Sequence, residues 1–109
     1  MTRELDLLQG TLDVLVLRAL SWGPMHGYAV ARFIRHGSTG TFKVLDGALY
    51  TSLHRMEERG WVESEWGISE TNRKVRFYRL TPAGLAQLEA ELADYRRVHE
   101  AIDAVLRTA

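Results

Sequence analysis

Apolar residues recur at helical spacing between residues 47 and 60, in the segment GALYTSLHRMEERG. Leu49, Leu53 and Met56 follow one another at spacings of four and three residues, so they lie on one face of a predicted helix. Asp46 is in position to cap the start of this helix, and Gly60 is in position to end it. The opposite face then presents a polar and aromatic cluster to solvent: Tyr50, Thr51, His54 and Arg55.

Two shorter helices are expected before this one. The run from Thr11 to Ser21 is apolar on more than one side, so we expect something outside its own domain to cover the surplus. A second helix is predicted in HGYAVARFIRHG, with Gly37 ending it in the left-handed conformation. The connector to the third helix is about ten residues long and briefly β-prone at 41–45, which favours a winged helix-turn-helix over the simplest form.

A β-hairpin is predicted after the third helix. WVESEWG and VRFYRL both alternate between apolar and polar positions, and the polar segment ISETNRK lies between them. In the second strand Tyr78 and Leu80 share one face, while Phe77 and Arg79 share the other. Basic side chains gather at the tip and on the returning strand, where they could bracket a phosphate backbone. A solvated charged loop is the alternative interpretation.

The last predicted helix has a clear start signal. Thr81 is expected to be its N-cap and Pro82 its first residue, while Gly84 indicates close packing or simple tolerance near the start. From Pro82 to Arg107 the helix would be roughly 39 Å long at about 1.5 Å per residue. A compact domain of this size is only about 26 Å wide, so this helix must project.

Along the projecting helix the apolar residues alternate between spacings of three and four, which is a heptad seam of about three repeats. One chain offers no surface to cover such a seam, and the first helix also has more apolar surface than its own domain can cover. We therefore predict a homodimer formed through these two helices. His99 on the seam is either a tolerated polar residue or a group sensitive to pH or to an effector. The expected interface comprises Leu12, Leu15, Leu88, Leu92, Tyr95, His99, Ile102 and Leu106.

These patterns predict a mainly α fold with a small β-hairpin (α+β). Residues 1–81 are expected to form a winged helix-turn-helix DNA-binding domain, and residues 82–109 a C-terminal dimerisation helix. The chain has 109 residues, of which 46% are apolar, and this suffices for one modest core.

Composition excludes several classes of site. The chain has no cysteine, which rules out disulfides, thiolate zinc sites and a cysteine nucleophile. Its four histidines lack metal-ligand spacing, and neither a Gly-rich phosphate loop nor a nucleophile motif is present. We expect no enzyme activity, no metal and no cofactor. The charged N-terminus lacks a secretory apolar region and no apolar run could span a bilayer, so a cytoplasmic protein without membrane contact is expected.

The charges are unevenly distributed along the chain. Net charge is zero, but residues 26–84 hold nine Lys or Arg against six Asp or Glu, and both flanking segments are acidic. A basic middle region is compatible with a nucleic-acid partner.

Several motifs together resemble the PadR family of bacterial transcriptional regulators, in particular its short members with a single C-terminal helix. They are LLQGTLDVLVLRAL, GPMHGYAVARFI, DGALYTSLHRMEERGWVESEW and NRKVRFYRLTPAGLAQLEAEL, and they cover about residues 7–106. The resemblance implies a winged helix-turn-helix dimer that binds double-stranded DNA at promoters and represses them. It also implies release of the DNA when a small effector binds near the dimer interface.

Particular residues take roles from this resemblance. Tyr50 corresponds to the family's tyrosine near the start of the recognition helix, and His54 and Arg55 follow it. Thr51 stands where the family usually has proline, although its hydroxyl can also bind a phosphate or a base. A tryptophan in the last helix accompanies aromatic drug binding in some members, and this chain has Tyr95 there instead. The family's basic wing segment is matched by Asn72, Arg73, Lys74 and Arg76.

Structural alternatives accompany these roles. Tyr50 could fold back as a partly buried ring, and His54 and Arg55 could pair with Glu58. The tryptophans Trp22, Trp61 and Trp66 are expected to be packing residues at the edges of loops and strands. For the whole chain, the alternative is a winged-helix module that binds another protein rather than DNA.

Overall fold

A computed structural model describes residues 5–6 and 9–108 of the chain. Its helices are α1 (Gln9–Leu20), α2 (Gly27–Gly37), α3 (Asp46–Glu58) and α4 (Pro82–Leu106). The strands are β1 (Leu5–Asp6), β2 (Met25–His26), β3 (Phe42–Lys43), β4 (Val62–Ile68) and β5 (Lys74–Leu80). This confirms the predicted mainly α fold with a hairpin. The predicted domain limits also include residues 1–4, 7–8 and 109, which lie outside the described residues.

The core lies among the first three helices and the base of the hairpin. α1 is its central element, and α3 contributes the apolar stripe of Leu49, Leu53 and Met56, each at most 1% exposed. Tyr78 closes the core from β5, and burial raises the pKa of its phenol above the ordinary value. The predicted inward face of α3 is therefore confirmed.

The surplus apolar surface of α1 is covered largely from within the chain. The start of α4 packs along α1, and Leu88 of α4 is in the same buried cluster as Leu12 of α1. Both side chains are 2% exposed. They belong to the core of a single chain, so the structure does not support their assignment to an interface with a second copy. Leu15 and Leu92 are half-buried against this core and keep only part of their surface open.

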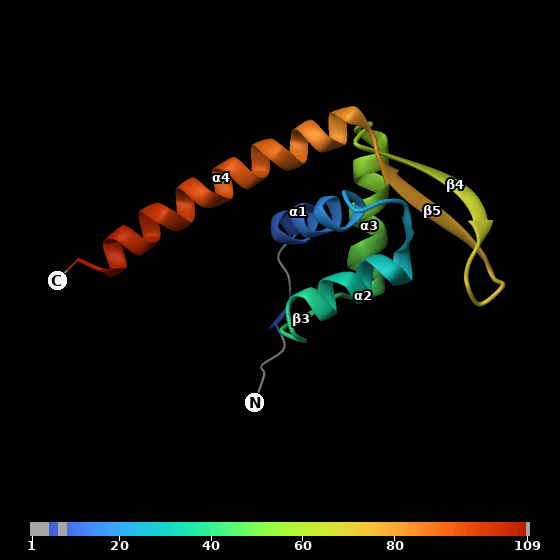
Figure 1. Ribbon diagram of the computed structural model, residues 1–109, viewed down its shortest axis with the longest axis horizontal. Coiled ribbons are helices and arrows are strands. Elements are labelled where there is room, and N and C mark those ends of the chain that lie inside the picture. The colour runs from blue at the N-terminus through green and yellow to red at the C-terminus, as the bar shows by residue number, and fades with distance from the viewer. Residues whose placement is uncertain (1–4, 7–8, 109) are drawn as a thin grey trace.

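The hairpin forms most of a three-stranded antiparallel sheet with the order β2-β5-β4. β4 and β5 pair from Val62↔Leu80 to Ile68↔Lys74, so Trp66 lies directly opposite Arg76. The turn between the strands contains Asn72 at φ 61°, a left-handed conformation that asparagine tolerates well. Figure 1 shows the hairpin extending from the helical body as a wing. β1 and β3 form a separate two-stranded parallel pair.

Several helix ends differ from the sequence predictions. Asp46 is the first residue of α3 and not its cap, because Leu45 occupies the cap position and makes no side-chain hydrogen bond there. Gly37 ends α2 without a left-handed backbone, which falls instead on Thr39 and Gly40 at φ 52° and 79°. The start of α2 is capped by the ring of His26, which accepts from the Ala29 amide at 3.2 Å. A histidine in this capping role is not recognisable from spacing alone.

The start of α4 matches its prediction. The Thr81 hydroxyl accepts from the Gly84 amide at 3.1 Å, and Pro82 is the first helical residue. Gly84 is required for packing, because a methyl group added there would lie 2.0 Å from the Trp61 carbonyl oxygen. Gly60 at φ 76° ends α3 as expected and leads the chain into this junction. From here α4 projects far beyond the body, on the side away from the wing (Figure 1), and the molecule is 57 Å long.

Candidate nucleic-acid interface

The solvent face of α3 contains three of the four predicted residues. Tyr50, Thr51 and His54 are exposed, Tyr50 at 43%. Tyr50, His54 and Glu57 follow at spacings of four and three residues, so they form one line along the helix. This line runs from the start of α3 toward the base of the wing.

The Tyr50 ring is both packed and exposed. It covers Gly27 at the start of α2, where an added methyl group would lie 2.7 Å from the Tyr50 hydroxyl oxygen. The absence of a side chain at Gly27 therefore permits the ring to settle across α2. The remaining surface of the ring faces solvent beside Thr51 and His54. The backbone of α2 thus fixes the orientation of the ring without hiding it.

Arg55 does not belong to the outward cluster. Its guanidinium binds both carboxylate oxygens of Asp13 in α1, and Ser52 donates a further hydrogen bond to that carboxylate at 2.6 Å. Asp13 is 8% exposed and the side chain of Arg55 is 23% exposed. Arg55 was expected on the DNA-facing surface, but this contact instead joins α3 to α1. Arg55 therefore has a structural role in holding α3 in place.

The wing presents a compact group of cations around Trp66. The indole is 61% exposed, and it lies on the same face of the hairpin as Lys74 and Arg76. The Lys74 ammonium lies 5.0 Å from the ring centroid and the Arg76 guanidinium carbon 5.5 Å. Both distances fall within the range of a cation–π contact. We define Trp66, Lys74 and Arg76 as the wing cluster.

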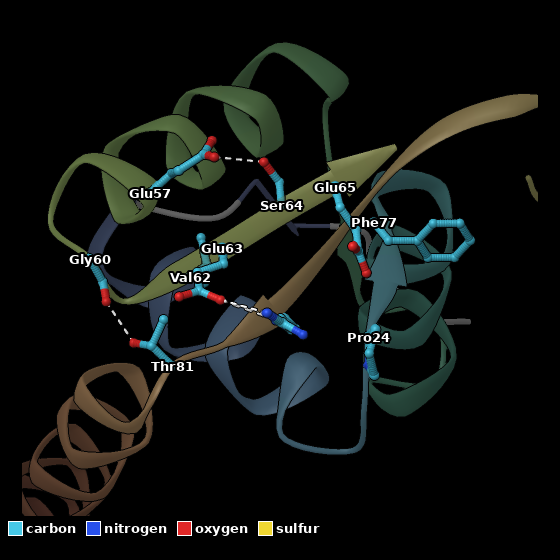
Figure 2. Close-up of a pocket in the computed structure, with 10 residues that line it drawn as sticks. Pro24, Glu57, Gly60, Val62, Glu63, Ser64, Glu65, Phe77 and Thr81 are labelled. Carbon is cyan, nitrogen blue, oxygen red and sulfur yellow. Dashed lines mark hydrogen bonds and ion pairs between the residues drawn. The ribbon is translucent and has the colours of Figure 1, made fainter. Parts of the chain in front are cut away.

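A polar bridge joins the wing cluster to α3. Arg76 donates from Nε to the Ser64 hydroxyl at 2.7 Å, and Ser64 donates to the Glu57 carboxylate at 2.6 Å. Figure 2 shows Glu57 of α3 and Ser64 of β4 turned toward each other. A nitrogen of Arg76 also lies 3.7 Å from Glu57, which offsets the charge of that acid. The line of exposed residues on α3 therefore continues onto the wing cluster.

The other polar residues of the wing are divided between its tip and its opposite face. Asn72 and Arg73 are exposed in the turn, which is closed by a hydrogen bond from the Ser69 amide to the Arg73 carbonyl at 2.8 Å. Asn72 has a conformational role there, because its left-handed backbone reverses the chain. Arg79 lies on the face away from the wing cluster and pairs with Glu63 at 2.8 Å.

A hollow of about 410 Å³ lies at the root of the wing, between the end of α3 and the sheet. Figure 2 shows its lining, in which three described acids, Glu57, Glu63 and Glu65, outnumber the one described cation, Arg79. A lining of net negative charge disfavours phosphate, so we do not assign a phosphate to the hollow, although Glu57 and Ser64 also form the bridge to Arg76. Among the described residues, no group of three or more His, Asp or Glu side chains is arranged to hold a metal ion.

A second exposed surface runs along the far half of α4. Its apolar members are Tyr95, Val98, Ile102, Val105 and Leu106, each at least 46% exposed. His99 stacks on Tyr95 with the ring centroids 3.9 Å apart, and its Nδ1 lies 2.9 Å from the Tyr95 carbonyl oxygen. Isolated apolar residues on a surface are ordinary, but a continuous stripe on a projecting helix marks an interaction surface. Five of the predicted interface residues are exposed or partly exposed on this half of α4 or just before it: Leu92, Tyr95, His99, Ile102 and Leu106.

Three residues important to this geometry were missed or misplaced by sequence reasoning. Trp66 was expected to pack at a strand edge, and it is exposed because the wing extends past the helical body. Glu57 and Asp13 gave no signal, because their partners lie on other elements. The alternation of β4 and β5 was the one available clue to Trp66, since pairing the strands brings it opposite Arg76.

Comparisons with known proteins identify a matching family and several relatives. The family model described as the transcriptional regulator PadR-like family matches residues 16–90, more than half of the chain. The transcriptional regulator Rv3488 of Mycobacterium tuberculosis is 40% identical over 65 residues, which are 59% of this chain and 56% of that protein.

Solved structures show the same fold over nearly the whole chain. A PadR-like transcriptional regulator from Bacillus cereus is 27% identical with a TM-score of 0.79, covering 94% of this chain and 97% of that one. A transcriptional regulator from Clostridium thermocellum is 25% identical with a TM-score of 0.80, covering 88% and 90%. In the described part of the chain, no helix has the length and apolar character needed to cross a membrane.

The matching family and the named regulators among its relatives share one function class, which is transcriptional regulation and not catalysis. The predicted winged fold and the absence of enzyme activity are both in agreement with these relatives. The chain belongs to the PadR-like family of transcriptional regulators.

Proposed function

We propose that the chain binds double-stranded DNA in a sequence-specific manner as a homodimer and represses the promoter to which it binds. In this proposal α3 enters the major groove and presents Tyr50, Thr51 and His54 to the base edges. The wing lies along the adjacent backbone, where Arg73, Lys74 and Arg76 meet phosphates. Asn72 shapes the wing tip, and Arg55 supports α3 from behind.

One observation carries this proposal: the exposed line of α3 continues onto the wing cluster through the bridge from Glu57 to Ser64 and Arg76. A helix in the major groove reads the sequence through its contacts to bases, but contacts to phosphates fix its position on the duplex. Cations beside the helix therefore need a fixed distance and direction from it. The bridge supplies this fixed distance and direction. It also compensates Glu57, an acid on this surface that would otherwise repel the phosphate backbone.

The far half of α4 supports the homodimer. Its exposed apolar stripe would be covered by a second copy of the same helix, and a two-fold axis would then relate two copies of α3. A symmetric dimer of this type reads a palindromic site with half-sites about one helical turn apart. Leu92, Tyr95, His99, Ile102 and Leu106 form our proposed contact, with Leu15 at its edge.

Repression and its relief follow from the same geometry. A dimer bound across a promoter blocks access of the polymerase to it. A small effector bound at the interface between copies would change the separation of the two α3 helices and so release the DNA. We place the protein in the cytoplasm, where bacterial DNA is located.

Salt dependence tests the DNA-binding proposal against the alternative of a protein-binding winged helix. The full chain is titrated onto DNA selected from a random-sequence library, at several salt concentrations. Neutralisation of several phosphates makes log K fall linearly with log salt at a slope of about −0.9 per phosphate contacted. Failure to select any DNA, together with a nearly flat salt response on mixed-sequence duplex, would favour the protein-binding module.

A further inference from the structure

The wing cluster is an unusual arrangement of charge for an exposed hairpin. Two cations on β5 lie against one indole on β4, at 5.0 Å and 5.5 Å from its centroid. Like charges on neighbouring same-face positions of a strand repel each other, and long side chains there ordinarily sample many rotamers. The negative face of the indole attracts both cations, which offsets this repulsion.

We propose that Trp66 is a positioning residue of the wing, whose exposed indole holds Lys74 and Arg76 together in the orientation in which they meet DNA phosphates. The inference rests on the proposed DNA binding and adds to it a residue without formal charge. Trp66 contributes by ordering the two cations before the DNA arrives. The Ser64 hydroxyl anchors the Arg76 end of this arrangement, and the indole is the shared support for both cations.

Preorganisation gives this arrangement its effect on affinity. Immobilising a long, rotamer-rich side chain at an interface costs conformational entropy, which weakens binding. The indole already restricts the rotamers of Lys74 and Arg76 in the free protein, so less entropy is lost when DNA binds. Removing the indole while keeping both charges should weaken binding by about five- to tenfold. The number of phosphates neutralised should stay the same.

The wing cluster lies on the face of the hairpin that is turned toward the exposed residues of α3. Arg76 is joined through Ser64 to Glu57 at the end of α3, so the cluster faces the side on which α3 exposes Tyr50 and His54. The opposite face of the hairpin contains Glu63 and Glu65, and its cation Arg79 is already paired with Glu63. Only the Trp66 face therefore combines cations with proximity to the recognition helix, within the described residues.

The test measures binding of the full chain to a mixed-sequence DNA duplex at several salt concentrations. The variants are Trp66→Leu, which removes the aromatic face, and Trp66→Phe, which keeps a weaker one. Trp22→Leu is the matched control, because Trp22 is 70% exposed and has Arg18 over its ring at 5.6 Å, but lies outside the wing. Thermal unfolding of each variant checks that the fold is retained.

We expect Trp66→Leu to bind about five- to tenfold more weakly at an unchanged salt slope, Trp66→Phe to recover most of that loss, and Trp22→Leu to bind like the wild type. In the Lys74→Met background, Trp66→Leu should weaken DNA binding less than it does alone, because the indole then orders only one cation, Arg76. Equal binding by Trp66→Leu and the wild type overturns the inference. So does a salt slope reduced by about two in a variant that unfolds like the wild type, because Lys74 and Arg76 would then have lost their phosphate contacts altogether. If the wild type itself shows no salt-dependent DNA binding, the proposed function fails first.

Discussion

The carboxylate of Asp13 in α1 binds the guanidinium of Arg55 in α3, and Ser52 donates to the same carboxylate. Asp13 and Arg55 lie 42 positions apart in the sequence, and Asp13 is 8% exposed. The contact fixes the recognition helix on the central helix of the core. It also explains why a basic residue in the middle of α3 is absent from its outward surface.

Asp13→Asn is expected to lower the free energy of unfolding by about 3 kcal/mol, because it removes the carboxylate charge that pairs with the largely buried Arg55 guanidinium. Urea unfolding followed by circular dichroism measures this change. Asp46→Asn, an exposed acid in the first turn of α3, is the matched control and should change stability by less than about 0.5 kcal/mol. Equal effects of the two substitutions would show that the Asp13 contact does not hold α3.

Tyr50→Ala is expected to weaken DNA binding by about tenfold or more while leaving the chain folded, because the ring is 43% exposed on the proposed recognition surface. Tyr50→Phe separates the roles of ring and hydroxyl, since it keeps the packing across Gly27. Gly27→Ala should also weaken binding, because the added methyl group displaces the ring. Fluorescence anisotropy with labelled DNA measures all three. Wild-type affinity in Tyr50→Ala would remove this residue from the interface.

Arg76→Gln and Arg79→Gln provide a comparison between the two faces of β5. Arg76 belongs to the wing cluster, so its loss should reduce the salt slope of DNA binding by about one. Arg79 pairs with Glu63 on the opposite face, and its replacement should leave the slope unchanged. A reduction of the slope by Arg79→Gln alone would mean that DNA lies on the other side of the wing.

Ile102→Asp is expected to convert a dimer to a monomer, since it places a charge in the exposed apolar stripe of α4. Ala104→Asp adds the same side chain at an exposed position on the other side of the helix, and should leave the dimer intact. Sedimentation velocity distinguishes the two species. The stability of the helical body should change little in either variant, because neither position belongs to the core. A stable dimer in Ile102→Asp would place the interface elsewhere.

Gly84→Ala tests the junction between the winged domain and α4. The new methyl group would lie 2.0 Å from the Trp61 carbonyl, so the start of α4 must shift, at a cost of about 1–3 kcal/mol. Gly37→Ala adds a methyl group in open space near the end of α2 and should be neutral or slightly stabilising. Thermal unfolding compares the two. Wild-type stability in Gly84→Ala would contradict the tight packing of this junction.

Much of the fold could be predicted because its signals are local. The Thr81 cap with Pro82, the left-handed Gly60 and the apolar stripe of α3 each depend on a few neighbouring residues. What could not be predicted depends on contacts between distant elements. The projection of α4 was foreseen, but not that Leu88 near its start would enter the core beside Leu12.

The candidate site shows the same division. Sequence periodicity correctly predicted that Tyr50, Thr51 and His54 are exposed, since each faces away from the apolar stripe. It could not foresee that Arg55 turns to Asp13, because that acid lies in another helix. Trp66 was misjudged for a related reason: alternation puts it on the face of Val62, but the core ends before the wing does.

A hydroxyl-radical footprint on DNA selected from a random library tests whether the chain binds DNA as a symmetric dimer. We expect two symmetric protected segments with centres about one helical turn apart, one for each copy of α3. Arg76→Gln should reduce protection at the outer flanks, where the wings lie, and leave the central segments in place. A single asymmetric segment would contradict the two-fold dimer, and the absence of any protected segment would contradict DNA binding itself.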